Sequence, residues 1–228
     1  MCDADFESAA WKAGCTHVAG TDEVGRGALA GPVLAAAVIL DPDAIPEGLD
    51  DSKLLSRHRR EVLAERVRET ALAWAVARVE ADEIDRINIL QASLKAMRLA
   101  VEALDPAADW VLVDGNRALP GCKPDQLTIV GGDHLSVSIA AASIVAKVTR
   151  DLLMREFDGL WPGYGFASHV GYGTLAHQEA LRLIGPSPIH RRTFRGVLDP
   201  CLPLRDHLRT NDPGERVAQA RRRVAITA

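Results

Sequence analysis

The sequence predicts an α/β domain built on a mixed central sheet flanked by helices. Short apolar stretches typical of buried strands are interspersed with longer stretches of helical periodicity. Two strand-like stretches come first, and the short link between them predicts antiparallel neighbours. Helices and strands then alternate, an order that is typical of α/β domains.

Five stretches are predicted as strands. Val33 to Leu40 is a near-continuous apolar run, which is typical of a strand buried on both faces. The preceding strand, His17 to Thr21, leads into Asp22 and a glycine-punctuated loop. The other three strands are expected at residues 71–79, 110–113 and 127–130.

Four longer stretches are predicted as helices. Asp82 to Leu104 is the longest periodic one, because apolar residues recur there at three- and four-residue steps. Ser52 to Thr70 is charged and helix-forming, with Ser52 as the expected N-cap. The third helix, Ser138 to Phe157, is rich in alanines that allow close packing on the sheet, and a shorter one follows at 174–183.

Composition is that of an ordinary globular protein, with 47% hydrophobic and 25% charged residues. No apolar run approaches the roughly 20 residues of a membrane span, and the acidic N-terminus lacks the features of a secretory signal. The four cysteines, Cys2, Cys15, Cys122 and Cys201, have no metal-ligand spacing and are expected to be free, buried thiols. We therefore expect a cytoplasmic protein without a membrane partner.

The formal net charge of −4 argues mildly against a nucleic-acid partner, because phosphate binding needs Lys and Arg. Basic residues nevertheless cluster at 53–60, 190–195 and 221–223, and a local basic face can coexist with an acidic total. An ordinary solvated surface is the competing interpretation of each cluster.

Four carboxylates, Asp22, Glu23, Asp114 and Asp133, lie where a predicted strand stops and glycine begins. Loops beyond strand ends form the functional crevice of open α/β sheets, so these carboxylates could converge there. Converging carboxylates need a positive counter-charge, and Mg²⁺ prefers oxygen ligands. Two such ions would suit phosphodiester hydrolysis. The alternative is a set of unrelated turn aspartates, which are common beside glycine.

Two features of the first strand end bear on this site. Asp22 and Glu23 are consecutive, so both can face one metal centre only if the strand ends or twists there. The following Gly25-Arg26-Gly27 lets the main chain approach a sugar hydroxyl or a phosphate closely. It does not complete a dinucleotide-binding fingerprint, because a strand and not a helix is predicted to follow.

Residues 19–33 closely resemble the signature of bacterial ribonuclease HII, a type 2 ribonuclease H. Further segments resemble the family in the same order, at 51–55, 84–90, 113–116, 138–151, 171–177 and 190–194. The resemblance implies a ribonuclease H-like fold with a small helical C-terminal part. The catalytic domain is then expected at residues 15–198, after an N-terminal extension at 1–14 and before a C-terminal tail at 199–228.

The resemblance also implies roles for individual residues. Asp22, Glu23, Asp114 and Asp133 are expected to be catalytic and to bind a divalent metal, Mn²⁺ or Mg²⁺. The backbone of Gly25, Arg26 and Gly27 is expected to sense the ribose 2′-hydroxyl, and Tyr172 to lie against the next sugar. Lys53, Ser138, Ser143 and Lys147 are expected near the nucleic-acid backbone.

The implied activity is hydrolysis of the RNA strand of RNA–DNA hybrids, together with cleavage on the 5′ side of single ribonucleotides embedded in duplex DNA. Such cleavage leaves 3′-hydroxyl and 5′-phosphate ends. The expected partners are therefore RNA–DNA hybrids and ribonucleotide-containing duplexes, bound by a monomer. Two departures from the family stand out: Gly131 replaces a common lysine, and Gly173 replaces a common proline and so loosens the loop that holds Tyr172.

Three other classes of protein would share some of these features. A junction resolvase of the same fold would also use clustered carboxylates, but it has no 2′-hydroxyl to sense. A catalytically silent nucleic-acid-binding module predicts loss of at least one carboxylate, and none is lost. A nucleotide-binding metabolic enzyme is disfavoured because the chain has no phosphate-binding P-loop motif.

Overall fold

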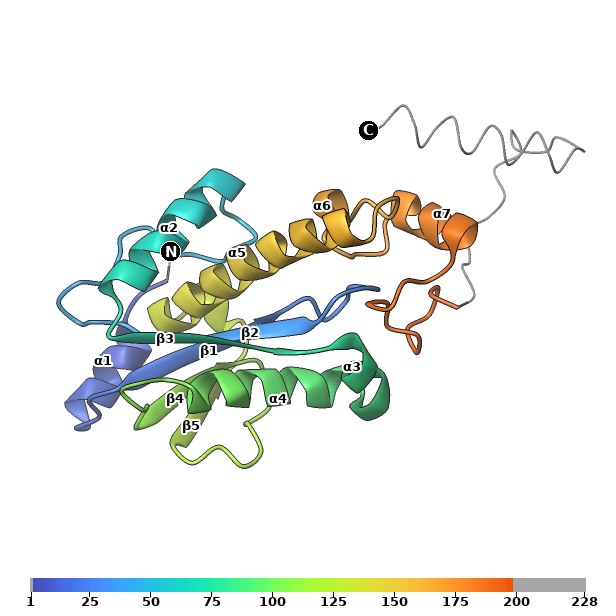
Figure 1. Cartoon of the computed structure of the whole chain (residues 1–228). Helices are drawn as coiled ribbons and strands as arrows, with labels where there is room; N and C mark the ends of the chain where they lie inside the picture. Colours follow the sequence, from blue (N-terminus) through green and yellow to red (C-terminus); the bar gives the residue numbers. More distant parts are fainter. Residues whose placement is uncertain (1, 199–228) are drawn as a thin grey trace, which may run out of the picture.

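The computed structural model describes residues 2–198 and contains a five-stranded sheet with the strand order β3-β2-β1-β4-β5 (Figure 1). The strands are β1 (Val18–Val24), β2 (Val33–Ile39), β3 (Ala73–Val79), β4 (Trp110–Asp114) and β5 (Asp125–Ile129). Strand β2 pairs antiparallel with both β1 and β3, whereas β4 pairs parallel with β1 and β5 parallel with β4. The predicted mixed sheet is confirmed, and the C-terminal ends of β1, β4 and β5 share one edge.

Helices cover both faces of this sheet. On one face lies α4 (Ile89–Glu102), continued from α3 (Ala81–Ile87); on the other lies α5 (Val137–Leu160), with α2 (Arg57–Thr70) beside it. Alternate residues of β2 belong to two separate cores: Val33 packs with the α4 side and Leu34 with the α5 side. Burial on both faces explains why the run in β2 is continuously apolar.

Two predicted helices differ from the structure. The helix predicted from Ser52 begins at Arg57 instead, and its N-cap is Ser56, whose Oγ accepts a hydrogen bond from the Arg59 N–H at 3.3 Å. Residues 51–54 form a turn in which Asp51 accepts the Leu54 and Lys53 N–H groups. An aspartate that binds its own backbone in this way favours a turn over a helix.

The helix predicted at 82–104 is two helices in the structure. Asn88 separates them with a φ of 67°, and its side chain caps α4 by accepting the Gln91 N–H at 3.2 Å. Asparagine tolerates the left-handed region and caps helices well. The apolar period runs through the break, so periodicity alone predicted one helix.

The N-terminal segment contains a helix that was not predicted, α1 (Asp5–Lys12). Its Glu7 is fully buried and accepts hydrogen bonds from the Ser136 hydroxyl at 2.5 Å and the Ser138 N–H at 2.9 Å. A carboxylate at the start of α5 suits the positive end of the helix dipole. The N-terminal segment therefore packs against the start of α5, and the domain boundaries stay predictions.

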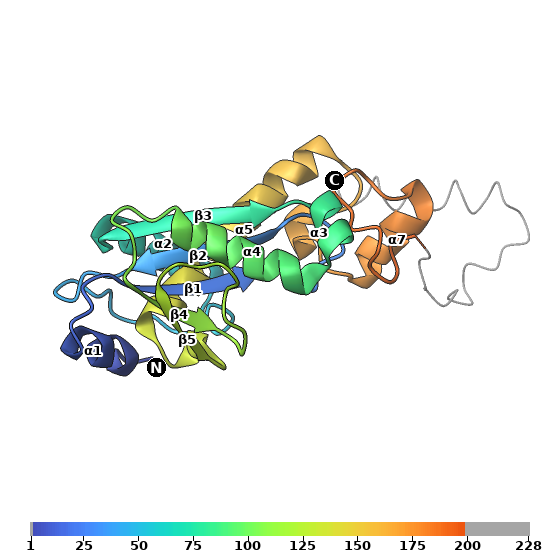
Figure 2. The same cartoon turned by 90° about the horizontal axis from the view of Figure 1, so that it is seen from below.

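Beyond the sheet, α6 (Phe166–His169) and α7 (Leu175–Ile184) pack around the C-terminal end of α5 (Figures 1 and 2). Thr174 caps α7, so the predicted short helix is confirmed. Cys2, Cys15 and Cys122 are free thiols, but only Cys2 is buried. The predicted tail at 199–228, with Cys201 and the 221–223 arginines, lies outside the described residues. No helix in the described part of the chain is long and apolar enough to cross a membrane.

Candidate active site

Three predicted carboxylates meet at the shared edge of the sheet. Asp22, Glu23 and Asp114 each place one carboxylate oxygen within 4.8 Å of the others. The parallel pairing of β1 with β4 explains this: Thr21 lies opposite Val113, so the next residues of the two strands are Asp22 and Asp114. Strand β1 does not end at Thr21 as predicted, since its pairing with β2 continues to Val24.

This cluster is electrostatically strained. Burial raises the pKa of Asp22 well above its ordinary value, and the charges of Glu23 and Asp114 raise it further. Burial also raises the pKa of Glu23, against the lowering effect of Arg26, whose Nη1 lies 2.9 Å from the Glu23 Oε1. The pKa of Asp114 is raised by burial and by Asp133. Buried carboxylates that repel one another are suited to a hard divalent cation, which takes oxygen ligands.

The fourth predicted carboxylate, Asp133, lies next to this cluster in the 3₁₀ turn Gly132–His134 that follows β5. The preceding Gly132 N–H donates to the Asp114 Oδ1 at 2.7 Å, which fixes the turn against β4. Asp133 forms a second possible metal-binding group with Asp51 and His134, again with ligand atoms within 4.8 Å.

Lys53 lies over the second group. Its Nζ is 3.1 Å from the Asp133 Oδ2 and 3.7 Å from the Asp51 Oδ1. Burial would lower the pKa of Lys53, but the hydrogen bond and charge of Asp133 outweigh it and raise the pKa. Sequence reasoning had singled out Lys53 and missed Asp51 and His134, although Asp51 opens one of the segments that resemble the family.

The other residues predicted near the nucleic-acid backbone are less accessible. Ser143 is buried, with its hydroxyl 3.0 Å from that of Ser52, and it also hydrogen-bonds to Asp22. Ser138 is fully buried beneath α1. Lys147 is half-buried and pairs with Asp151 at 2.6 Å. Ser138 is 0% exposed and Ser143 only 4%, so neither hydroxyl is open to a substrate in this structure.

The two glycines of the 25–27 loop have different surroundings. Gly25 is buried with a φ of 90°, and a Cβ there would lie 2.2 Å from the Arg150 Nε. Gly27 is exposed, and a Cβ there would meet only the Tyr172 ring, at an ordinary 3.8 Å. The structure thus requires a glycine at 25, whereas at 27 it leaves an open backbone facing solvent.

Tyr172 lies beside this loop, although the two are far apart in sequence. Ala28 pairs antiparallel with Tyr172, and the Leu29 N–H donates to the Gly171 carbonyl at 2.8 Å. The Tyr172 side chain is 37% exposed, so its ring is available to a ligand. The predicted sugar-sensing elements are therefore adjacent in space.

A buried relay of histidines holds the Tyr172 backbone. The His177 Nδ1 lies 2.9 Å from the Tyr172 carbonyl, and the His177 Nε2 lies 2.9 Å from the His190 Nε2. The His190 Nδ1 in turn accepts the Ser187 N–H at 2.9 Å. Since a carbonyl only accepts and an N–H only donates, His177 donates from Nδ1, His190 donates from Nε2, and both rings are neutral.

Burial agrees with that assignment, because it lowers the pKa of His177 and of His190 to about 4. Sequence reasoning had treated the basic residues at 190–195 as one cluster, either a nucleic-acid face or a solvated surface. Both interpretations are wrong for His190 and Arg191, which are buried. Their proximity to the glycine loop is a long-range contact that no local pattern shows.

Residues 19–197 match the ribonuclease HII family. The chain belongs to the ribonuclease HII family. Ribonuclease HII of Geobacter sulfurreducens is 56% identical over 193 residues, which cover 85% of this chain and 88% of that protein. Ribonuclease HII of an Anaeromyxobacter species is 54% identical over 192 residues; the match covers 84% of this chain but only 61% of that longer relative.

Solved structures agree at the level of the fold. The ribonuclease H2 of Pyrococcus horikoshii is 23% identical with a TM-score of 0.66, over 90% of this chain and 99% of that one. Bst-RNase HIII in complex with Mn²⁺ is 20% identical with a TM-score of 0.62, over 94% of this chain and 73% of that one. The predicted ribonuclease H-like fold is confirmed. As a ribonuclease HII, the chain is a metal-dependent endoribonuclease that acts on RNA in RNA–DNA hybrids.

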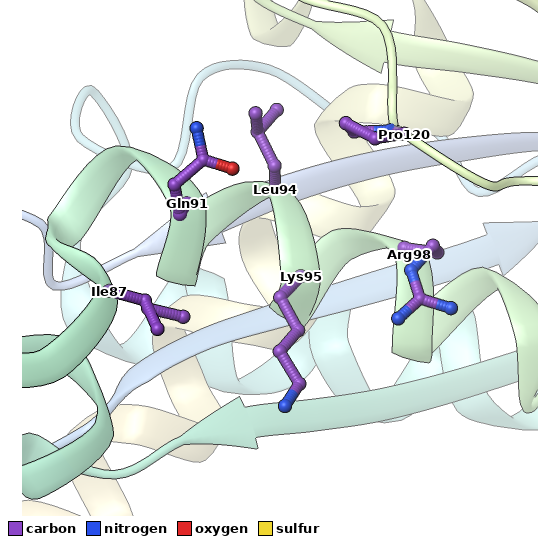
Figure 3. Close-up of a pocket in the computed structure, with 6 residues that line it drawn as sticks. All are labelled: Ile87, Gln91, Leu94, Lys95, Arg98 and Pro120. Carbon is purple, nitrogen blue, oxygen red and sulfur yellow. The ribbon is translucent and has the colours of Figure 1, made fainter.

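A separate depression lies along α4, near its junction with α3 (Figure 3). It encloses about 340 Å³ and is lined by side chains of α3, α4 and the loop after β4: Ile87, Gln91, Leu94, Lys95, Arg98 and Pro120. Its two cations are paired with acids, Lys95 with Glu83 and Arg98 with Glu102, each at 2.7 Å. None of the ribonuclease HII carboxylates lines it, so it is not part of the active site.

Proposed function

We propose that this ribonuclease, besides hydrolysing the RNA strand of hybrids, cuts on the 5′ side of a single ribonucleotide embedded in duplex DNA. The observation that carries the proposal is the placement of the exposed Gly27 backbone beside the Tyr172 ring. The loop that carries Gly27 follows directly from β1, which bears Asp22 and Glu23. Only three residues therefore separate Glu23 from Gly27 along the chain.

The carboxylates fit a pair of divalent cations, Mn²⁺ or Mg²⁺. Asp22, Glu23 and Asp114 would hold one, and Asp133 with Asp51 and His134 would contribute to the second. All of these donors are hard carboxylate oxygens except the His134 imidazole nitrogen. Bound there, such cations supply activation of a water and stabilisation of the leaving oxygen, which gives 3′-hydroxyl and 5′-phosphate ends. Lys53, 75% exposed above Asp133, is placed to pair with a phosphate of the cut strand.

Discrimination between RNA and DNA is assigned to backbone groups around Arg26 and Gly27. A site built to hydrogen-bond a hydroxyl can reject the analogue that lacks it by roughly 10⁴-fold, because its polar groups are then unpaired. The flat face of Tyr172 suits the apolar side of a deoxyribose, which makes a ribonucleotide followed by DNA the best match. We propose a monomer in the cytoplasm whose partners are RNA–DNA hybrids and ribonucleotide-containing duplexes.

The test compares three duplexes of one sequence: one with a single ribonucleotide, one with a continuous RNA strand and one of DNA only. We expect cleavage 5′ of the ribonucleotide, none of the DNA duplex, and dependence on Mn²⁺ or Mg²⁺. Tyr172→Ala should lower kcat/KM on the single ribonucleotide about tenfold more than on the hybrid, because only that substrate places deoxyribose on the ring. Tyr172→Phe, which keeps the ring, should retain most of the difference. Equal losses on both substrates would remove Tyr172 from recognition.

A further inference from the structure

A single buried arginine joins the two sugar-sensing elements. Arg150, on α5, is fully buried and donates to carbonyls at the end of the glycine loop: its Nε to Pro32 and its Nη2 to Ala30, each at 3.2 Å. Its remaining nitrogen, Nη1, donates to the Val170 carbonyl at 2.8 Å, two residues before Tyr172. One planar group thus contacts both segments.

The same guanidinium also contacts Tyr172 and the first residue of the glycine loop. It lies 5.8 Å from the centre of the Tyr172 ring, within the range of a cation–π contact. It also packs against Gly25, where it leaves no room for a Cβ. Arg150 therefore contacts both the start of the glycine loop and the tyrosine.

Charge balance does not account for this arginine. Among the described residues, no carboxylate forms an ion pair with Arg150, and its guanidinium donates to the carbonyls of Pro32, Ala30 and Val170. Burying a cation without a carboxylate is unfavourable unless hydrogen bonds compensate, and here three do. An arginine fork fixes the spacing of several acceptors at once, which a lysine ammonium does not.

The backbone next to Tyr172 gives an independent sign of constraint. Val170 has a φ of 44°, in the left-handed region that a β-branched residue rarely adopts. Such a conformation persists only where the surroundings hold it. The Arg150 Nη1 binds the Val170 carbonyl, and the Val170 N–H donates to Phe166 at 2.9 Å, so the strained residue is held from both sides.

We propose that Arg150 is a positioning residue for substrate specificity, setting the distance between the backbone around Gly27 and the ring of Tyr172. Arg150 touches neither the reacting phosphate nor the carboxylates; it acts through Tyr172. The proposal rests on the proposed function, because it concerns the choice between a single ribonucleotide and a continuous hybrid.

Arg191 offers a matched control. It is also a buried arginine that binds the loop, through Nε to the Gly31 carbonyl at 3.0 Å and through Nη1 to the Arg26 carbonyl at 2.9 Å. Its ring contact is Phe194, and within the described residues it forms no hydrogen bond to the 170–172 segment. Arg191→Lys should therefore weaken the loop on both substrates without changing the ratio between them.

The experiment measures kcat/KM on the single-ribonucleotide duplex divided by kcat/KM on the continuous hybrid. Both substrates carry a 2′-hydroxyl at the cut, and the ratio is independent of how much enzyme is folded. Arg150→Lys should lower it about five- to tenfold, since sub-ångström to 1 Å misplacement has effects of that order or more. In a Tyr172→Ala background, Arg150→Lys should change the ratio by less than about twofold, because both act through the same ring.

Two outcomes overturn different claims. If Tyr172→Ala lowers the ratio and Arg150→Lys leaves it unchanged, the positioning role is wrong while the proposed function stands. If Tyr172→Ala itself leaves the ratio unchanged, the proposed function fails. Should Arg150→Lys not fold, Gly25→Ala displaces the same guanidinium with its Cβ, and its effect on the ratio must likewise vanish in the Tyr172→Ala background. An effect that persists there would contradict the proposal.

Discussion

Two neighbouring regions of the molecule differ in how their polar groups are balanced. One is the carboxylate edge, formed by Asp22, Glu23 and Asp114. The other is the glycine-loop clamp, formed by the buried side chains that hold the 25–32 loop and Tyr172: Arg150, Arg191, His177 and His190. At the edge, Asp22, Glu23 and Asp114 are buried together, and burial and mutual repulsion raise their pKa values. In the clamp, the groups of His177 and Arg150 that face the loop and Tyr172 are matched to backbone acceptors. Asp22 and Asp114 lack an ion-pair partner among the described residues, whereas these groups of His177 and Arg150 are paired within the chain.

The comparison shows that the two regions have different requirements. Repulsion among the carboxylates would favour a divalent metal at the place where we propose that the phosphodiester is hydrolysed. Recognition needs the reverse, a surface already held in its binding geometry. Substitutions in the two regions should therefore have opposite effects on stability, although both lower activity.

The largest expected effect is on turnover at the carboxylate edge. Asp114→Asn removes a proposed metal ligand from the cluster, so kcat should fall by roughly 10²–10³-fold or more on both hybrid and single-ribonucleotide substrates. Duplex binding measured without divalent metal should survive, because removing a negative charge does not weaken attraction to phosphate. Cleavage assays under single-turnover conditions, with a filter-binding control, measure both. Near-normal turnover would contradict a role for Asp114 as metal ligand.

The next largest effect is a difference in stability between substitutions at Gly25 and at Gly27. Gly25→Ala places a Cβ against Arg150 at a φ of 90°, so the free energy of unfolding should fall by about 2–3 kcal/mol. Gly27→Ala meets no clash, so its stability should stay within about 0.5 kcal/mol of the parent while cleavage of both substrates falls. Urea unfolding of the matched pair measures the difference. Equal losses of stability would show that the loop is not clamped as described.

A smaller effect is expected from pH in the clamp. His177 and His190 have a folded pKa of about 4, below the ordinary value of 6.5. Their contribution to stability is present above pH 6.5 and is lost as the pH falls towards 4, because the unfolded chain takes up protons first. Relative to His190→Gln, the parent should lose about 1–2 kcal/mol over that window. Carboxylate titrations are shared by both proteins and cancel. Parallel stability curves would contradict the neutral relay.

The sequence predicted most of the carboxylate edge because its signals are local. Asp114 and Asp133 lie next to a glycine at the end of a predicted strand, and Asp22 and Glu23 lie within three residues of Gly25. The order of elements predicted a mixed sheet, and the structure supplies the strand order. Two predicted helices failed through local competition: Asp51 turns the chain where a helix was expected, and Asn88 separates α3 from α4 without disturbing the apolar period.

The clamp could not be predicted in the same way. Arg150 and Arg191 resemble surface residues in sequence, and their burial depends on contacts across 118 to 165 positions. The sequence singled out the glycine loop by its missing side chains, and Tyr172 was added by the family resemblance, but their adjacency was not visible in either segment. Hydrogen bonds between a buried arginine and carbonyls far away in the chain produce no periodic pattern in the sequence.

Thermal unfolding with and without Mn²⁺ at neutral pH tests directly whether the carboxylates repel one another in the absence of metal, with a glycine-loop variant as the comparison. In metal-free buffer, Asp114→Asn should be more stable than the parent by about 1 kcal/mol, because one of the repelling charges is gone. Millimolar Mn²⁺ should raise the Tm of the parent, and of Gly27→Ala as a control, by about 5 °C, and that of Asp114→Asn by much less. A parent Tm indifferent to Mn²⁺, or an Asp114→Asn variant less stable than the parent without metal, would contradict the account.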